Sequence, residues 1–379
     1  MKYASKKFFA ALLACALCAG GVAMAWADVK IDAENFPDEN FRQWVKENAA
    51  GGKDVLTDAQ CAAVTDMNIP DEGISSLKGI EHFTELTALN CYGNELTELD
   101  LSHSPALEML ICGDNELAAL NLSGSSALET LDCHDNKLTA LDLSHSPALK
   151  HLDCHNNELT ALDLSENGAL EELDCNDNAL TALDLSRHPA LGKVFCMDNA
   201  LTTLDLSGSR ALNTLDCQDN KLTALDLSKN GALEALYCND NELTALDLSK
   251  NGALEFLACE DNELAALDLS KNRNLSGASL PETARVTLPN GDKIAMKDFR
   301  VAKGKDGKLR LDLSRYGGKI GRVYATLKGE QEVKEEVKVK SAKGVHTFAP
   351  FDGSLTITYR LGRDAELELI LSVQEEEEE

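Results

Sequence analysis

The chain has 379 residues and a formal net charge of −28 at pH 7. Its length exceeds the usual size of a single compact core, which favours internal repeats or several domains. A surface this acidic repels the phosphates of nucleic acids and of anionic membranes, so nucleic acid is excluded as an expected partner.

Residues 1–27 have the pattern of a secretory signal peptide. Lysines precede an apolar run from Phe8 to Met24, and Ala25-Trp26-Ala27 offers a cleavage site between small residues. Cys15 ends a lipobox-like Leu-Leu-Ala-Cys, so lipid attachment stays an alternative to free secretion. No later stretch reaches the roughly 20 apolar residues that span a membrane. We therefore expect a mature chain without a transmembrane segment, secreted or held at the cell surface or cell envelope.

The segment 28–85 is predicted to be a helical cap over the N-terminal end of the core. Residues 36–47 carry apolar side chains at close to helical spacing. Thr57 and Gln60 fit a capping box, which predicts a helix over residues 58–64.

Nine units of equal length fill residues 86–274 and share the pattern L-x-x-L-x-C-x-x-N-x-L-x-x-L-D-L-S. Each unit contains two short extended segments, because the cysteine of the first half takes the place of a leucine in the second. A unit this small cannot bury its own leucines, so the units must stack into a solenoid with strands about 4.8 Å apart. The cysteines that repeat are Cys91, Cys112, Cys133, Cys154, Cys175, Cys196, Cys217, Cys238 and Cys259.

The periodic cysteine and asparagine are both predicted to serve the stacking. A thiol can line the interior as a small hydrophobe, and an asparagine at the turn can satisfy backbone groups of adjacent turns. An exported chain meets oxidising conditions, so scattered disulfides or a thiolate metal site are alternatives. Side chains that point in parallel along a column do not favour the roughly 90° torsion of a disulfide, which supports a buried, reduced ladder.

This repeat resembles that of bacterial leucine-rich repeat proteins, in the short 21-residue class with two nested halves, L-x-x-L-x-C-x-x-N-x and L-x-x-L-D-L-S. It departs from the internalin repeat, which is slightly longer and lacks this cysteine and the second L-D-L half. Internalin receptor contacts are therefore not carried over. The resemblance implies a leucine-rich repeat solenoid in a secreted or surface-exposed binding protein.

Residues 275–379 depart from the repeat and alternate apolar with polar side chains, as in "KLRLDLS" and "SLTITYR". This alternation predicts a small antiparallel β-rich module. The run Glu375–Glu379 is expected to be an acidic, solubilising tail.

No catalytic pattern is visible, since H-E-x-x-H, G-x-S-x-G, a phosphate loop and a C-x-x-C pair are all missing from residues 28–379. We expect a protein that is not an enzyme and needs no cofactor. The aspartates of the L-D-L halves are periodic, which is typical of a solvated ladder, with weak binding of divalent cations as the alternative.

Four residues are candidates for an exposed zinc site. His134 and His155 share a repeat position on adjacent turns, while His151 and Asp153 lie on one short strand. With Asp132, they offer imidazole and carboxylate groups, which are zinc ligands. Surface histidines that hold no metal are the simpler alternative.

The residue before each cysteine varies from unit to unit, and it should point outward because strand neighbours alternate. Phe195, Met197, Tyr237 and Phe256 are therefore predicted to share one face across units six, eight and nine and to bind a ligand. Sequence drift at positions that packing does not constrain is the alternative.

Three classes of function are considered at this point, and an enzyme is the least favoured of them. The favoured one is a monomeric binding or adhesion protein for an extracellular protein or glycan, which needs a varied outer face. The alternative is a structural component of the cell envelope that assembles with itself, for which a uniform face would suffice.

Overall fold

The computed structural model describes residues 28–299, 302–303, 309–327, 340–342, 345–348, 353–361 and 366–373. The predicted signal peptide, residues 1–27, and the predicted tail, Glu375–Glu379, lie outside these ranges. Within them, every helix is too short or too polar to cross a membrane.

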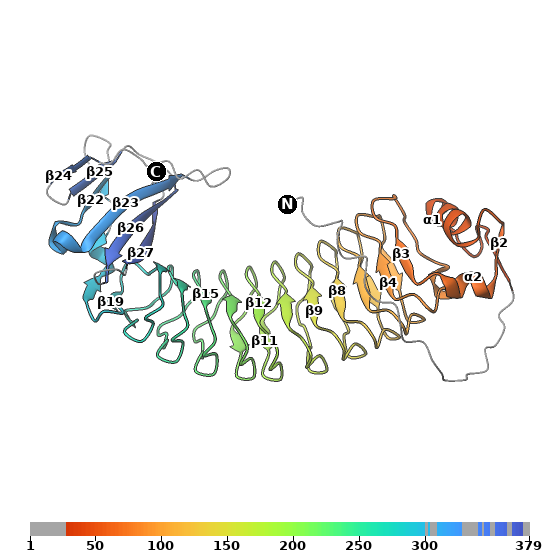
Figure 1. Ribbon diagram of the computed structural model, residues 1–379, viewed down its shortest axis with the longest axis horizontal. Helices are drawn as coiled ribbons and strands as arrows, with labels where there is room; N and C mark the ends of the chain where they lie inside the picture. The colour runs from red at the N-terminus through yellow and green to blue at the C-terminus, as the bar shows by residue number, and fades with distance from the viewer. Residues whose placement is uncertain are drawn as a thin grey trace.

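The N-terminal cap combines short helices with a small sheet. Helix α1 spans Glu39–Trp44 and runs on as a π-helix over Val45–Ala49, and helix α2 spans Asp58–Ala63. Strand β1 (Val29–Lys30) pairs antiparallel with β2 (Val55–Leu56). The cap closes one end of a curved row of stacked turns (Figure 1).

The predicted capping box at the start of α2 is confirmed. The Thr57 hydroxyl accepts a hydrogen bond from the Gln60 N–H, and Gln60 Oε1 accepts one from the Thr57 N–H at 3.1 Å. Phe36, Phe41 and Phe83 are fully buried where the cap meets the first turn, so the cap shields the apolar end of the core from water.

The turns stack through a parallel ladder of three-residue strands in a sheet of 14 strands. Equivalent positions pair from turn to turn, as Leu131 does with Leu152, so the apolar residues form a continuous buried column. The strands are β3 (Asp66–Asn68), β4 (Ala88–Asn90), β6 (Met109–Ile111), β8 (Thr130–Asp132), β9 (His151–Asp153), β10 (Glu172–Asp174), β12 (Lys193–Phe195), β14 (Thr214–Asp216), β15 (Ala235–Tyr237), β16 (Phe256–Ala258) and β18 (Gly277–Ser279).

The second half of the repeat forms strands in only some of the turns. These strands are β5 (Glu98–Asp100), β7 (Ala119–Asn121), β11 (Ala182–Asp184), β13 (Thr203–Asp205) and β17 (Ala266–Asp268). β19 (Arg285–Thr287) pairs with β17, and β20 (Lys293–Ala295) pairs with β19 in the antiparallel sense.

The nine repeat cysteines are fully buried and unbonded to one another in the stacked core. The asparagine that follows each of them bonds both its own turn and the preceding one, as predicted. Asn178 Nδ2 donates to the carbonyl oxygens of Cys154 at 3.0 Å and Cys175 at 3.3 Å. Asn178 Oδ1 accepts from the N–H of Leu159 at 3.0 Å. These bonds satisfy groups that adjacent turns would otherwise bury unpaired.

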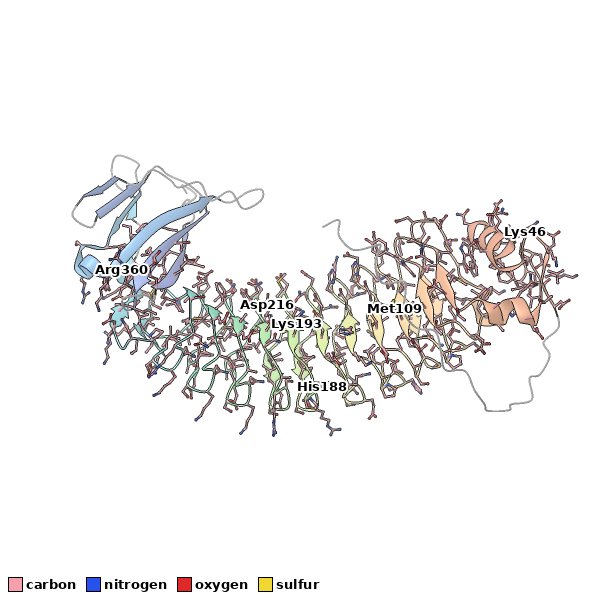
Figure 2. The ribbon with its side chains drawn as sticks, viewed as in Figure 1. Lys46, Met109, His188, Lys193, Asp216 and Arg360 are labelled. Carbon is pink, nitrogen blue, oxygen red and sulfur yellow. The ribbon has the colours of Figure 1, made fainter. Side chains whose placement is uncertain are left out.

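A second buried polar ladder follows the L-D-L-S segment. Its members are at most 1% exposed, and those from Ser125 onward bond carbonyl groups of the preceding turn, as Asn230 Nδ2 does with Leu206 O at 3.1 Å. Figure 2 places one member, His188, toward the outer side of the curve. The ladder comprises Ser104, Ser125, Ser146, Asn167, His188, Ser209, Asn230, Asn251 and Asn272.

The parallel ladder extends past the nine counted units at both ends. Met67 pairs with Leu89 ahead of the first unit, and Ala278 pairs with Leu257 after the last. Met67 and Ala278 are fully buried, so they fill the leucine column without matching the pattern. The domain boundaries at residues 28–85, 86–274 and 275–379 stay a prediction.

The predicted C-terminal β module is present and continues the solenoid sheet. β27 (Glu366–Val373) pairs in parallel with β18, and β26 (Gly353–Arg360) and β23 (Ile320–Leu327) follow as antiparallel neighbours. A separate antiparallel sheet contains β21 (Ala302–Lys303), β22 (Leu309–Asp312), β25 (Val345–Phe348) and β24 (Lys340–Ala342). Short 3-10 helices span Ile80–His82, Met296–Phe299 and Ser314–Lys319.

Candidate functional site

The outward surface of the solenoid strands in the 14-stranded sheet, here called the sheet face, carries the variable residues of the repeat. In each strand the middle residue is buried, and the first and third residues point outward. The residue after the cysteine adds a third column. Met109, Lys193 and Asp216 are labelled members of this face (Figure 2).

Two of the predicted ligand-binding residues touch each other on this face. The ring centroids of Tyr237 on β15 and Phe256 on β16 lie 5.1 Å apart, with 35° between the ring planes. The Phe256 ring also covers Gly277 on β18, where a Cβ atom would lie 3.0 Å from Phe256 Cδ2. Both rings are half-buried, because they lean on neighbouring turns instead of standing free in solvent.

The other two predicted residues form a separate group. Phe195 on β12 is paired in register with Asp216 on β14, which is paired in turn with Tyr237. The carboxylate therefore lies between Phe195 and the Tyr237–Phe256 pair. Met197 follows Phe195, and its Sδ atom lies 3.2 Å from Gln218 Nε2. The structure thus places all four residues on one face but divides them into two groups.

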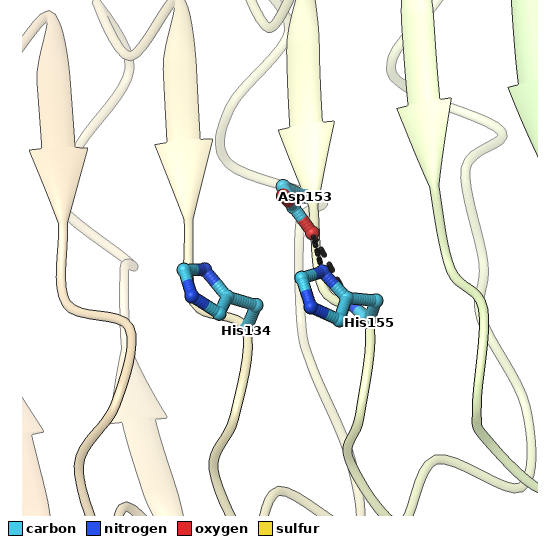
Figure 3. A group of neighbouring side chains, drawn as sticks. All are labelled: His134, Asp153 and His155. Atoms are coloured by element: carbon cyan, nitrogen blue, oxygen red, sulfur yellow. Dashed lines mark hydrogen bonds and ion pairs between the residues drawn. The ribbon is translucent and has the colours of Figure 1, made fainter. Parts of the chain in front are cut away.

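Three of the four zinc candidates, His134, Asp153 and His155, lie together on two adjacent turns (Figure 3). The rings of His134 and His155 stack with centroids 4.6 Å apart and 7° between their planes. Nδ1 of His134 lies 2.5 Å from Oδ1 of Asp132, and Nδ1 of His155 lies 2.6 Å from Oδ1 of Asp153. Ligand atoms of His134, Asp153 and His155 all lie within 4.8 Å of one another.

His151, the remaining zinc candidate, lies apart from this group. Nδ1 of His151 is 4.0 Å from Oε2 of Glu172 on the next strand. Although His151 shares a strand with Asp153, it lies in the first column of the sheet face, whereas His134 and His155 lie in the third. The structure therefore does not bring His151 to the other candidate ligands.

Tyr92 and Gly113 lie in the same column of the sheet face as His134, and neither was predicted from the sequence to belong to the site. The Tyr92 and His134 ring centroids are 5.9 Å apart, although Gly113 belongs to the turn between them. A Cβ at Gly113 would lie 2.6 Å from His134 Cε1, so only glycine leaves room for the imidazole. The available signal was a glycine at a repeat position that elsewhere holds a larger side chain.

Carboxylates of the sheet face have perturbed acidity. Burial, reinforced by the neighbouring Asp153 and Asp177 charges, raises the pKa of Asp174 to about 6. Burial also raises the pKa of Asp216. The hydrogen bond to Asp132 raises the pKa of His134, and the charges of Asp132, Asp153 and Asp135 add to this effect.

A hollow lies where the last turn meets the C-terminal module. It has a volume of about 770 Å³, and cationic side chains surround Asp247 and Asp268 there. These cations are Lys271, Arg285, Lys293 and Arg315. Arg315 Nη1 is already paired with Asp298 Oδ2 at 2.6 Å, so part of this positive charge is neutralised within the chain.

The stacked 21-residue turns, with their leucine, cysteine and asparagine columns, give this chain the fold of a leucine-rich repeat solenoid. Residues 36–167, less than half of the chain, match the family described as the leucine-rich repeat domain of endo-β-N-acetylglucosaminidase EndoS. A comparison with curated proteins gives no match.

Solved structures share the fold at low sequence identity. The functional domain of InlJ from Listeria monocytogenes is 23% identical, with 92% of this chain and 99% of that chain covered and a TM-score of 0.53. The leucine-rich repeat domain of APL1B is 20% identical, with 61% and 73% covered and a TM-score of 0.51. These likenesses show the fold alone. Since InlJ includes a cysteine ladder, the cysteine does not by itself separate this chain from Listeria proteins of this fold.

Proposed function

We propose that the chain is a secreted or surface-exposed binding protein that holds an extracellular protein or glycan on its sheet face. The observation that carries this proposal is the contact between Tyr237 and Phe256 on an outward surface. Large aromatic side chains that are half-exposed and rest on a rigid scaffold are typical anchors of binding interfaces.

The contrast between interior and exterior supports binding over a purely architectural role. Stacking alone accounts for the buried leucine, cysteine and asparagine columns, which repeat with little variation. It does not account for aromatic rings at Phe195, Tyr237 and Phe256, because other turns place aspartate, threonine or alanine at the same positions. A self-assembling envelope component would be served by a uniform face, so we propose a monomer that presents one specialised region.

The binding region would combine the aromatic pair with nearby polar groups. Asp216 and Gln218 lie between the Tyr237–Phe256 pair and Phe195. Such a mixture offers apolar contact area at the centre and hydrogen-bonding groups beside it, as in other recognition surfaces. It suits a protein segment or a glycan, both of which present apolar and hydroxyl or amide groups together.

The test is a variant that carries Phe195→Ala, Tyr237→Ala and Phe256→Ala. Parent and variant would be compared on a panel of purified extracellular proteins and on a glycan array, with Met109→Ala as a control. Met109 lies on the same face and is 43% exposed, but it is distant from the aromatic region. We expect the triple variant to melt near the parent temperature and lose a partner that the control keeps.

Equal binding by parent and triple variant would contradict the proposal. A large fall in melting temperature would assign the three rings to the core instead. Light scattering of the parent separates the two function classes, because concentration-dependent growth into large particles would favour self-assembly.

A further inference from the structure

We propose that His134, His155, Asp153 and Asp132 form a site for a divalent transition metal of the zinc class, shared between two adjacent turns of the solenoid. The site is independent of the aromatic region, since it lies on β8, β9 and the residues that follow them. It would hold the ion between side chains that the parallel ladder sets side by side (Figure 3).

The ladder register creates the geometry. Asp132 pairs with Asp153 across β8 and β9, and each aspartate is followed two residues later by a histidine. The same Asp–His pair therefore appears twice at one strand spacing. The result is two nearly parallel imidazoles with Nδ1 atoms that each face their own carboxylate, and Asp153 lies within 4.8 Å of both rings.

The chemistry of these groups selects the metal. Imidazole nitrogen and carboxylate oxygen together suit zinc, copper or nickel, whereas calcium and magnesium favour oxygen ligands alone. Zinc bonds to nitrogen and oxygen are about 2.0–2.2 Å long, so the ligand atoms must approach more closely than they do in the metal-free arrangement. The side chains of His134 and His155 are 18% and 32% exposed, so an ion can reach both from solvent.

Charge also favours a cation at this place. Asp135 adds a third carboxylate, with Oδ2 3.7 Å from Nε2 of His134, and Asp174 follows on the next strand. Nδ1 of each imidazole lies within hydrogen-bond distance of its own aspartate. A bound divalent ion would neutralise part of this negative charge.

The pair of dyads is confined to two consecutive turns. The position of His134 and His155 is occupied in the flanking turns by Gly113 and Asn176, and later by Met197 and Gln218. Stacking therefore does not require histidine at this position. Gly113 in addition leaves the space that the His134 ring occupies. Together these features describe a local arrangement of side chains and not a property of the repeat.

The experiment is a calorimetric titration of the full secreted chain with zinc chloride, after treatment with chelator, in the presence of a phosphine reductant. We expect saturable binding in the parent and a loss of about tenfold or more in affinity for His134→Gln and for His155→Gln. Asp132→Asn should weaken binding by about 10- to 100-fold, in the range seen when groups beside a metal are removed. His151→Gln is the matched control and should bind as the parent does, because His151 lies outside the cluster.

Calcium chloride should give no saturable heat, and circular dichroism should show that each variant is folded without metal. Cobalt substitution checks the ligands, because a thiolate charge-transfer band would place the ion on cysteine and overturn the proposal. Zinc binding that survives both histidine variants would also overturn it, as would a folded parent that binds no zinc.

Discussion

Gly113 and His134 are matched across adjacent turns: a Cβ atom on Gly113 would lie 2.6 Å from Cε1 of the His134 ring. The imidazole thus occupies the space of a missing side chain, and there it stacks on His155 and approaches Tyr92. One residue without a side chain therefore determines where a titratable ring lies in the next turn.

Gly113→Ala should move the His134 ring while leaving the fold intact. The added methyl group excludes the imidazole from its present place, so its hydrogen bond to Asp132 should weaken. The raised pKa of His134 should then fall toward its ordinary value. A proton NMR titration of the histidine ring signals measures this change.

Gly252→Ala is the matched control, because a Cβ atom there would meet nothing within 4 Å. Its His134 titration should follow the parent. An unchanged His134 pKa in Gly113→Ala would show that the ring does not need this space.

The asparagine column beside the cysteines and the second buried polar ladder should differ in their contribution to stability. Asn178 makes bonds through both Nδ2 and Oδ1, so Asn178→Ser should leave buried backbone groups unpaired and lower the unfolding free energy by about 1–3 kcal/mol. Asn230 Oδ1 has no partner among the described residues, and serine already occupies the equivalent position in other turns. Asn230→Ser should therefore cost less than about 1 kcal/mol. Urea denaturation of both variants measures the difference, and equal losses would contradict this account.

Stability should rise as the pH falls from 7 to 5 in the presence of chelator. Burial, and then the charges of neighbouring aspartates, raise the pKa of Asp174 in the folded chain to about 6. The folded chain therefore binds a proton at Asp174 more tightly than the unfolded chain does. Its stabilising contribution is complete below the unfolded value near 4 and is lost as pH rises through about 6. The raised pKa of His134 acts in the same direction around and above pH 6.5.

Below about pH 4 the trend should reverse. The N–H and then the hydroxyl of Ser228 lower the pKa of Asp226, and other L-D-L-S aspartates share this arrangement. Their stabilising contribution is present above the unfolded pKa and is lost as pH falls through the folded one. Thermal unfolding at several pH values measures both limbs. In an Asp174→Asn variant the unfolding temperature should rise less steeply as the pH falls from 7 to 5. An unaltered dependence of the unfolding temperature on pH would exclude Asp174 as a cause.

The repeat thiols should react with alkylating agents only after unfolding. Burial raises the pKa of the Cys91 thiol to about 12, and it raises the pKa of the other eight repeat cysteines as well. The thiolate that reacts is therefore scarce and inaccessible in the folded chain. Mass spectrometry after iodoacetamide treatment, with and without urea but without reductant, should show labelling of these cysteines only with urea. Cysteines that stay unlabelled in urea would be oxidised and would contradict the reduced ladder.

Local and periodic features could be predicted from the sequence. Thr57 and Gln60 define the capping box within a single helical turn, and its hydrogen bonds form as expected. Cys154 and Asn157 recur with the leucines, so their interior roles follow from repetition alone. The second ladder was missed because serine, asparagine and histidine alternate at its position and no single residue type marks it.

The period of the repeat, and with it the solenoid and the identity of its interior columns, was determined by the sequence alone. Each unit is too small to bury its own leucines, and stacking on an equivalent neighbouring unit buries them. Only the tertiary structure showed the contacts between side chains and strands that differ from one turn to the next. Asp216 separates Phe195 from Tyr237, Gly277 supports Phe256, and β27 joins the sheet beside β18 from a segment 91 residues away at Ser279 and Ile370. A ring orientation or a pairing across that distance depends on contacts between different side chains and strands, and such contacts leave no period in the chain.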